Sequence, residues 1–279
     1  MMEHMLKGVY DLHIHTSPDV VPRKCSDIEL GRRLIGAGMA GCAIKSHYFD
    51  TSARAGLIQE QFPQLHIVGG VVLNRSVGGI NPEAVERSAQ AGGKMVWFPT
   101  VESRSFQAFQ YRENPSPDLS HLLTVLDENG MLIPQAKAVV ETAVRHRMVV
   151  GTGHLSAQEG MALVAEAART GCQMVLTHAD NPADRYTIEQ QQEAVRQGAF
   201  VEHCFFTTYF NRTTIAEIAV QIRAVGCEHV ILTTDFGQPK APYSDEGMAQ
   251  YANLLLGQGF SRDELRQMMV DNPANLIFQ

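Results

Sequence analysis

The chain has 279 residues, which suits a single (β/α)8 barrel of about 250 residues. Its formal net charge of −7 argues against a nucleic-acid-binding protein, which needs a basic stripe, but it allows an anionic small substrate held by local arginines. The chain has no apolar run of about 18 residues, so we expect no membrane span. The charged start without an apolar leader, and five cysteines without C-x-x-C spacing, favour a reduced cytoplasmic location.

Short apolar runs alternate with helical segments along the whole chain. Most are continuous stretches of Val, Ile and Met, as expected for parallel strands that are buried on both faces. We predict eight strands, at residues 8–15, 41–47, 66–73, 94–100, 148–154, 173–178, 199–205 and 229–235.

Helix start and stop signals separate these strands. A serine followed three positions later by glutamate indicates a capping box, and glycines before the strands indicate helix ends. The strand–helix unit therefore recurs eight times, which predicts an α/β fold of the (β/α)8 TIM-barrel type. No linker divides the chain, so we predict a single domain over residues 1–279. The start signals are Ser26 with Glu29, Asn81 with Pro82, Ser156 with Glu159, and Ser261 with Glu264.

The connection after the fourth strand is long. Residues 103–118 are polar and aromatic, and residues 123–133 surround an Asn129-Gly130 pair that predicts a small β-hairpin. We interpret this segment as an excursion over the barrel mouth, with a plain surface loop as the alternative.

Polar residues recur at the ends of the predicted strands. His13 and His15 are two residues apart, so in a strand both imidazoles point to the same face. The carboxyl ends of all strands in a barrel meet at one face, where active sites are built. Histidines that only pack would not keep falling at these positions. The other strand-end candidates are Lys45, His47, His154, His178, Glu202 and Asp235.

These residue types fit a divalent metal centre. His13, His15 and Asp235 can hold one ion, and His154 and His178 can hold a second or complete the first. Imidazole and carboxylate suit zinc, with Mn, Fe or Ni as alternatives. An open coordination position would carry a water of lowered pKa. Asp235 could take its proton and later protonate the leaving group.

The same residues resemble a known group of enzymes. The strand-end set, with the tail Asn272-Pro273-Ala274-Asn275-Leu276, resembles the amidohydrolase superfamily of metal-dependent hydrolases. Residues 11–19, 44–47, 69–82, 96–100 and 152–156 resemble an uncharacterised, DUF6282-like group of amidohydrolase-like proteins. This resemblance implies a barrel fold and a metal site, and it leaves the substrate open.

One position departs from the superfamily pattern. Binuclear members place a carboxylated lysine or a glutamate at the end of strand four, where this chain has Trp97-Phe98-Pro99-Thr100 and then Glu102. Lys45 on the second strand could supply a carboxylated bridge instead, or remain an ammonium that binds a substrate anion. The Lys45–His47 pair also resembles the PHP phosphoesterases, although those have aspartate in place of the lysine.

Other residues have structural alternatives beside functional ones. His47 is a ligand or supports one, and alternation lets only one of Glu202 and His203 face inward, for which we favour Glu202. Asp11 fits a structural role, and Cys42 and Cys204 fit small core residues. Loop side chains that could bind a substrate carboxylate or phosphate, but could equally be solvated, are Arg23, Arg75, Arg104, Arg112, Tyr209 and Arg212.

We therefore expect a metal-dependent hydrolase that cleaves an amide, lactone or ester bond of a small polar or anionic substrate through metal-activated water. The alternatives are a PHP-like phosphoesterase, a metal-dependent lyase or decarboxylase, and a non-catalytic metal-binding barrel. The expected partner is a small-molecule substrate, with no nucleic acid and no membrane. The oligomeric state stays open, a homo-oligomer included.

Overall fold

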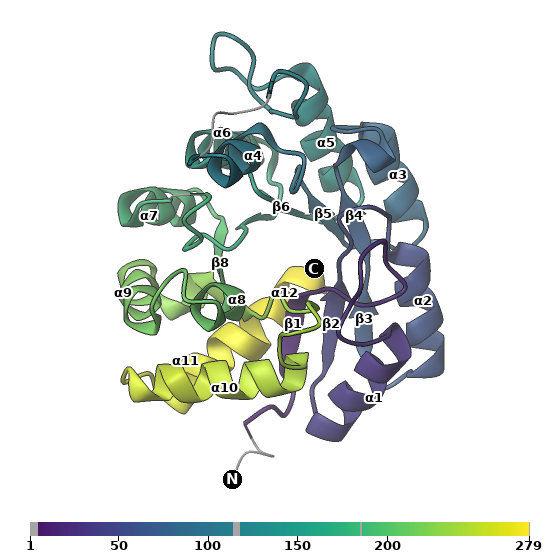
Figure 1. Ribbon diagram of the computed structural model, residues 1–279, viewed down its shortest axis with the longest axis vertical. Coiled ribbons are helices and arrows are strands. Elements are labelled where there is room, and N and C mark those ends of the chain that lie inside the picture. Colours follow the sequence, from purple (N-terminus) through teal and green to yellow (C-terminus); the bar gives the residue numbers. More distant parts are fainter. Residues whose placement is uncertain (1–4, 114–117, 185, 279) are drawn as a thin grey trace.

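Short parallel strands lie inside a ring of helices in the computed structural model, which describes residues 5–113, 118–184 and 186–278 (Figure 1). Within these residues, β1, β2 and β3 form one sheet in that order, and β4 to β9 form a second sheet in chain order. The strands are β1 (Tyr10–Ile14), β2 (Gly41–Ile44), β3 (His66–Val68), β4 (Gly70–Val72), β5 (Met95–Trp97), β6 (Val149–Gly151), β7 (Met174–Leu176), β8 (Phe200–Cys204) and β9 (Val230–Thr233).

The third predicted strand is interrupted at Gly69, between β3 and β4. A Cβ atom at Gly69 would lie 2.5 Å from the carbonyl oxygen of Thr51, so only glycine fits this close approach. The hydroxyl of Thr51 accepts a hydrogen bond from the Gly70 amide at 2.9 Å and donates one to the Ile44 carbonyl at 2.6 Å. Thr51, directly before helix α2 (Ser52–Gln61), is therefore inserted at the break between β3 and β4.

The outer strands β1 and β9 also meet. The amide of Asp235 donates to the His13 carbonyl, and the amide of His15 donates to the Phe236 carbonyl, each at 2.8 Å. The predicted α/β fold with parallel strands is confirmed. A single continuous eight-stranded ladder is not found in the described residues, because the hydrogen-bonded pattern divides into two sheets.

Helix boundaries follow the predicted start signals. Ser156 and Ser261 form complete capping boxes with the glutamates three residues later. Ser26 caps its helix, while Glu29 accepts a hydrogen bond from the Tyr243 hydroxyl at 3.1 Å. The helices are α1 (Asp27–Ala37), α2 (Ser52–Gln61), α3 (Pro82–Gln90), α4 (Arg104–Gln110), α5 (Pro134–Arg145), α6 (Ala157–Thr170), α7 (Ile188–Arg196), α8 (Phe205–Tyr209), α9 (Ile215–Val225), α10 (Ser244–Gly257), α11 (Arg262–Arg266) and α12 (Asn272–Ile277), with short turns η1 (Arg75–Val77), η2 (Cys227–His229) and η3 (Gln267–Asp271).

The long connection after β5 differs from its prediction. Residues 104–110 form helix α4 within the segment predicted as an excursion over the barrel mouth, and residues 114–117 of that segment lie outside the described part. The predicted hairpin is reduced to one antiparallel bridge between Leu126 and Leu132. Its turn is present, since Gly130 has a left-handed φ of 76°.

Two buried layers hold the strands in place. The larger one lies between the strands and the surrounding helices. The smaller one is formed by side chains of alternating strand positions and includes Leu12, Ala43, Trp97, Val175 and Ile231. Lys45 lies two residues after Ala43 and follows this alternation. In β1 the register shifts between Asp11 and Ile14, so His13 also comes to lie beside Lys45 and Trp97. In the described ranges, no helix combines the length and apolarity that crossing a membrane requires.

Candidate metal centre

Three predicted ligands meet at the carboxyl ends of β1 and β9. Oδ1 of Asp235 lies 3.0 Å from Nε2 of His13 and 3.1 Å from Nε2 of His15. The two imidazoles are buried, and the Asp235 side chain is 14% exposed. Two ring nitrogens and one carboxylate oxygen at this spacing form a donor set that suits a borderline divalent cation such as zinc.

Local structure fixes this set. His13 lies near the end of β1 and His15 directly follows it, and Asp235 follows β9 with a left-handed φ of 53°. Asp11 lies deeper and accepts hydrogen bonds from the Thr234 amide at 3.0 Å and from the hydroxyls of Thr234 and Ser244, both at 2.6 Å. The Asp11 carboxylate thereby holds β1 against the end of β9, which brings His13 to Asp235.

Glu202 faces His13 from β8. Nδ1 of His13 lies 3.1 Å from Oε1 of Glu202, which leaves Nε2 facing Asp235. Glu202 also accepts hydrogen bonds from the Thr233 hydroxyl at 2.9 Å and the His178 amide at 3.1 Å. The neighbouring His203 points elsewhere and contacts Asp180 at 3.0 Å, as strand alternation requires.

Opposing charges shape the titration of this pair. Burial and Lys45 lower the pKa of His13, but the carboxylates of Asp235 and Glu202 outweigh them and raise it to about 9. Burial alone would raise the pKa of Glu202, whereas the charge and hydrogen bond of His13 lower it to about 2. Both shifts follow from the close packing of the His13 ring between the carboxylates of Glu202 and Asp235.

Lys45 is completely buried beside His13. Its Nζ lies 2.9 Å from Nε2 of His13 and 5.3 Å from the centre of the Trp97 ring. Burial lowers the pKa of this lysine. Trp97, at the end of the fourth predicted strand, thus packs beneath the lysine where the superfamily pattern has a bridging ligand.

His154 and His178 form a second part of the cluster. Their ring centres are 4.9 Å apart, and His178 is 6.0 Å from His13. Nδ1 of His178 contacts the carboxylate of Asp184 at hydrogen-bonding range. Nε2 of His178 and Nδ1 of His154 are buried, without a hydrogen-bond partner among the described residues. These unpartnered nitrogens leave donors available to a cation.

His47 borders both parts of the cluster. Its ring centre lies 4.7 Å from that of His15 and 5.7 Å from that of His154, and its Nδ1 lies 2.9 Å from the Thr100 hydroxyl. Burial and the neighbouring histidines hold the pKa of His47 well below its usual range. A neutral imidazole is thereby favoured at the edge of the centre.

Four of the six predicted substrate-binding side chains, Arg23, Arg75, Arg104 and Tyr209, lie in different surroundings. Arg23 is buried beside Asp19 at 2.6 Å, and its charge contributes, after burial, to lowering the pKa of His15 to about 3. Arg75 is exposed and reaches the His121 carbonyl, and Arg104 is exposed on α4. Tyr209 is 38% exposed and packs on Phe236. Of these four, Arg23 is the one whose charge acts on a histidine of the centre within the described chain.

Two residues near the centre were not selected from the sequence as functional. Asp184 lies in the same loop as Asp180, and a loop has no periodic pattern that would indicate which of the two aspartates faces the centre. Cys204 was predicted to be a small core residue. It is buried, but its Sγ lies 3.8 Å from Nδ1 of His13, and with Glu202 it completes a second three-residue group around that ring. Its position two residues after Glu202 on β8 is the signal that could have found it.

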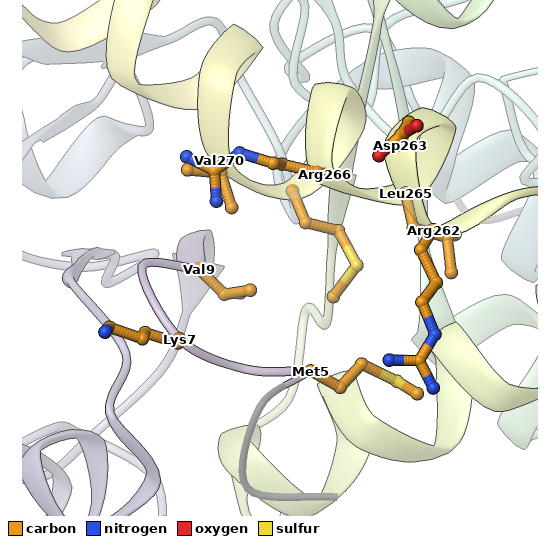
Figure 2. A pocket seen from close by; sticks show the side chains of 9 residues that line it. Met5, Lys7, Val9, Arg262, Asp263, Leu265, Arg266 and Val270 are labelled. Atoms are coloured by element: carbon orange, nitrogen blue, oxygen red, sulfur yellow. The ribbon is translucent and has the colours of Figure 1, made fainter. Parts of the chain in front are cut away.

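A separate cavity of about 170 Å³ lies away from this centre (Figure 2). It lies before β1, at the amino ends of the strands, where Met5, Lys7 and Val9 face Arg262 and Arg266. None of the predicted site residues lines it. The histidine cluster at the opposite ends of the strands therefore remains the candidate site.

Solved structures share this fold. An amidohydrolase from Pseudomonas aeruginosa matches with a TM-score of 0.66 at 13% identity, over 99% of this chain and 97% of that one. The probable dipeptidase PvdM from Pseudomonas aeruginosa matches with a TM-score of 0.70 at 12% identity, over 99% and 95%. A 2,6-dihydroxybenzoate decarboxylase from Rhizobium matches with a TM-score of 0.59 at 11% identity, over 97% and 98%. At these identities the likeness concerns the fold.

The sequence itself was compared as well. No curated protein matches the chain. A family described as a family of unknown function, DUF6282, matches residues 8–202. The expected resemblance, to an uncharacterised group with the fold of amidohydrolases, is confirmed. The chain therefore belongs to the DUF6282 family.

Proposed function

We propose that this protein is a metal-dependent hydrolase of the amidohydrolase type, acting on an amide, lactone or ester bond of a small polar substrate. The observation that carries the proposal is the convergence of His13 Nε2 and His15 Nε2 on Oδ1 of Asp235. We further propose that residues 1–279 act as one barrel domain, with these strand ends as its active site.

We assign metal binding and proton transfer to the residues at the ends of β1 and β9. His13, His15 and Asp235 would bind the ion, most simply zinc, with Mn, Fe and Ni as other options. When bound, such an ion supplies a Lewis acid and lowers the pKa of water. Asp235 contacts both histidines through Oδ1, so its Oδ2 would take a proton from the attacking water and return it to the leaving group.

Lys45 would act beside this set. As an ammonium it would bind the carbonyl oxygen or an anionic group of the substrate. Its neutral amine would alternatively add to carbon dioxide with release of a proton, and the carbamate formed would offer oxygen ligands to a second ion that His154 and His178 would hold. Arg23, whose side chain is buried beside Asp19 and whose charge acts on His15, would hold a carboxylate or phosphate of the substrate. His47 and Glu202 would keep His15 and His13 in place.

Measurement of bound metal tests the centre. Purified protein is loaded with zinc and dialysed, and the metal content is measured for the wild type and for His13→Asn, His15→Asn and Asp235→Asn. We expect each variant to lose the ion. His146→Asn is the control, because this partly exposed histidine pairs with Glu86 away from the centre. Full occupancy in all three site variants would refute the proposal.

A substrate screen tests the reaction. It comprises dipeptides, lactones, carboxylic esters, phosphate esters and aromatic carboxylic acids, with release of acid, phosphate or carbon dioxide as readouts. Decarboxylation is the second candidate, because the charge of Arg23 acts on His15 and the amine of Lys45 lies 2.9 Å from His13, and both groups would hold a carboxylate. Turnover that requires Asp235 on one substrate class would decide between hydrolase, phosphoesterase and lyase.

A further inference from the structure

Two histidines of the centre are held in the same way. Nδ1 of His13 faces the carboxylate of Glu202, and Nδ1 of His178 faces the carboxylate of Asp184. In proteins, a carboxylate that accepts the Nδ1 hydrogen of an imidazole fixes the tautomer, so that the lone pair lies on Nε2. The free Nε2 is then available to a cation.

The backbone of His178 is fixed from several sides. Its φ of 33° is left-handed, its amide donates to Glu202 at 3.1 Å, and its carbonyl accepts from the Asn181 amide at 2.8 Å. A non-glycine residue adopts this conformation only where its surroundings hold it there. With the backbone fixed and Nδ1 engaged, Nε2 is the ring atom left without a partner.

Asp184 is equally well anchored. Its side chain is 1% exposed, its amide donates to the Asn181 carbonyl at 2.9 Å, and its carbonyl accepts from the Ala157 amide at the start of α6 at 3.0 Å. A buried carboxylate is costly unless it is paired, and the pairing here is with His178. The loop after β7 thus places the Asp184 carboxylate against Nδ1 of His178.

We infer that Asp184 is a positioning residue of the metal centre, which fixes the orientation and tautomer of His178 so that its Nε2 binds a metal ion of that centre. This inference rests on the proposed metal-dependent function. It adds Asp184, a residue that the strand-end pattern did not supply. It also identifies Nε2 of His178 as a ligand atom in addition to those of His13, His15 and Asp235.

Metal affinity tests this role. Zinc dissociation constants are measured by competition with a chromophoric chelator for the wild type, Asp184→Asn, Asp184→Ala, His178→Asn and the double variant His178→Asn/Asp184→Ala. Asn can still accept the Nδ1 hydrogen, whereas Ala cannot. We expect about 10- to 100-fold weaker binding in Asp184→Ala and a smaller loss in Asp184→Asn. Cobalt-substituted protein should show the same order of change in its visible absorption spectrum.

The double variant separates positioning from general support of the fold. If Asp184 acts through His178, the Asp184→Ala change has no further effect on affinity once His178 is Asn. Asp180→Asn is the matched control, because Asp180 and His203 form another buried carboxylate–imidazole pair, at 3.0 Å, without contact to the three ligands in the described structure. We expect wild-type affinity and an unchanged cobalt spectrum for it.

The outcomes are distinguishable. Affinity within twofold of the wild type in both Asp184 variants, or additive losses in the double variant, would overturn the inference while leaving the metal centre intact. A loss of zinc affinity in Asp180→Asn as large as that in Asp184→Asn would also overturn it, since this would indicate a general effect of burying an amide in place of a carboxylate. Failure of the wild type to bind zinc or cobalt would overturn this inference and the proposed function together.

Discussion

Nζ of Lys45 and Nε2 of His13 lie 2.9 Å apart, and the same Nε2 lies 3.0 Å from Oδ1 of Asp235. One ring nitrogen therefore faces both an amine and a carboxylate. An ion bound to His13 would lie next to this amine, so the lysine is within reach of whatever the ion activates.

Replacement of Lys45 by Met should separate chemistry from metal binding. The set of His13, His15 and Asp235 does not use Nζ, so we expect the first ion to be retained and turnover to fall by about 10²- to 10⁴-fold. Metal content and turnover of one preparation are the measurements. Loss of the ion in this variant would point instead to Lys45 as a carboxylated bridge.

Replacement of Trp97 by Ala should destabilise the protein strongly. Trp97 is 2% exposed and fills the space under His13 and Lys45. Removing a buried indole typically costs about 3–5 kcal/mol, because the cavity only partly collapses. Chemical denaturation measures the free energy of unfolding. Leu57→Ala is the control, since Leu57 is 69% exposed and should change it by less than about 0.5 kcal/mol.

Replacement of Gly153 by Ala should disturb the position of His154. Gly153 has a φ of 66°, and a Cβ atom there would lie 2.2 Å from the Phe98 carbonyl oxygen. The backbone must move, so we expect a loss of more than about 1 kcal/mol in unfolding free energy. In contrast, Gly36→Ala on the exposed side of α1 meets nothing within 4 Å and should stabilise by about 0.4–1 kcal/mol. An equal response of both variants would contradict this account.

Stability in acid should depend on Glu264. Hydrogen bonds from Arg223 and from the Ser261 amide lower the pKa of Glu264 to about 2. A folded-state pKa below the unfolded value of about 4.3 means that the carboxylate stabilises the fold above that pH. This stabilisation is lost as the pH falls toward 2.

Melting temperatures of the wild type and Glu264→Gln, taken between pH 7 and pH 2.5, measure the effect. The difference should correspond to about 1 kcal/mol at pH 7 and shrink below pH 4.5. Exposed Glu60 on α2 provides the control variant Glu60→Gln. A difference for Glu264→Gln that stays constant down to pH 2.5 would refute the assignment.

The strands and their polar ends could be predicted from the sequence because both follow a simple period. His13 and His15 both contact Oδ1 of Asp235, as their two-residue spacing predicted, and Glu202 faces His13 while His203 faces Asp180, as alternation required. Asp235 comes directly after an apolar run, and the carboxyl ends of parallel strands converge. These rules depend on the backbone geometry of a strand alone.

Loop residues could not be predicted in this way. Asp184 reaches His178 through an irregular segment whose path depends on tertiary contacts, such as the Ala157 amide bound to the Asp184 carbonyl. The break at Gly69 was also missed, because the apolar run continues across it and only the insertion of Thr51 interrupts the ladder. Helix α4 lies in a segment without a strong apolar period.

The division of the strands into two sheets gives the metal set a mechanical role. His13 and His15 belong to the three-stranded sheet, whereas Asp235 follows the last strand of the six-stranded one. An ion held by all three would fasten the edge of one sheet to the edge of the other, across a seam joined by a few backbone hydrogen bonds. Its binding energy would then add to the free energy of unfolding, so that removal of the ion by a chelator would lower both the stability of the fold and the activity.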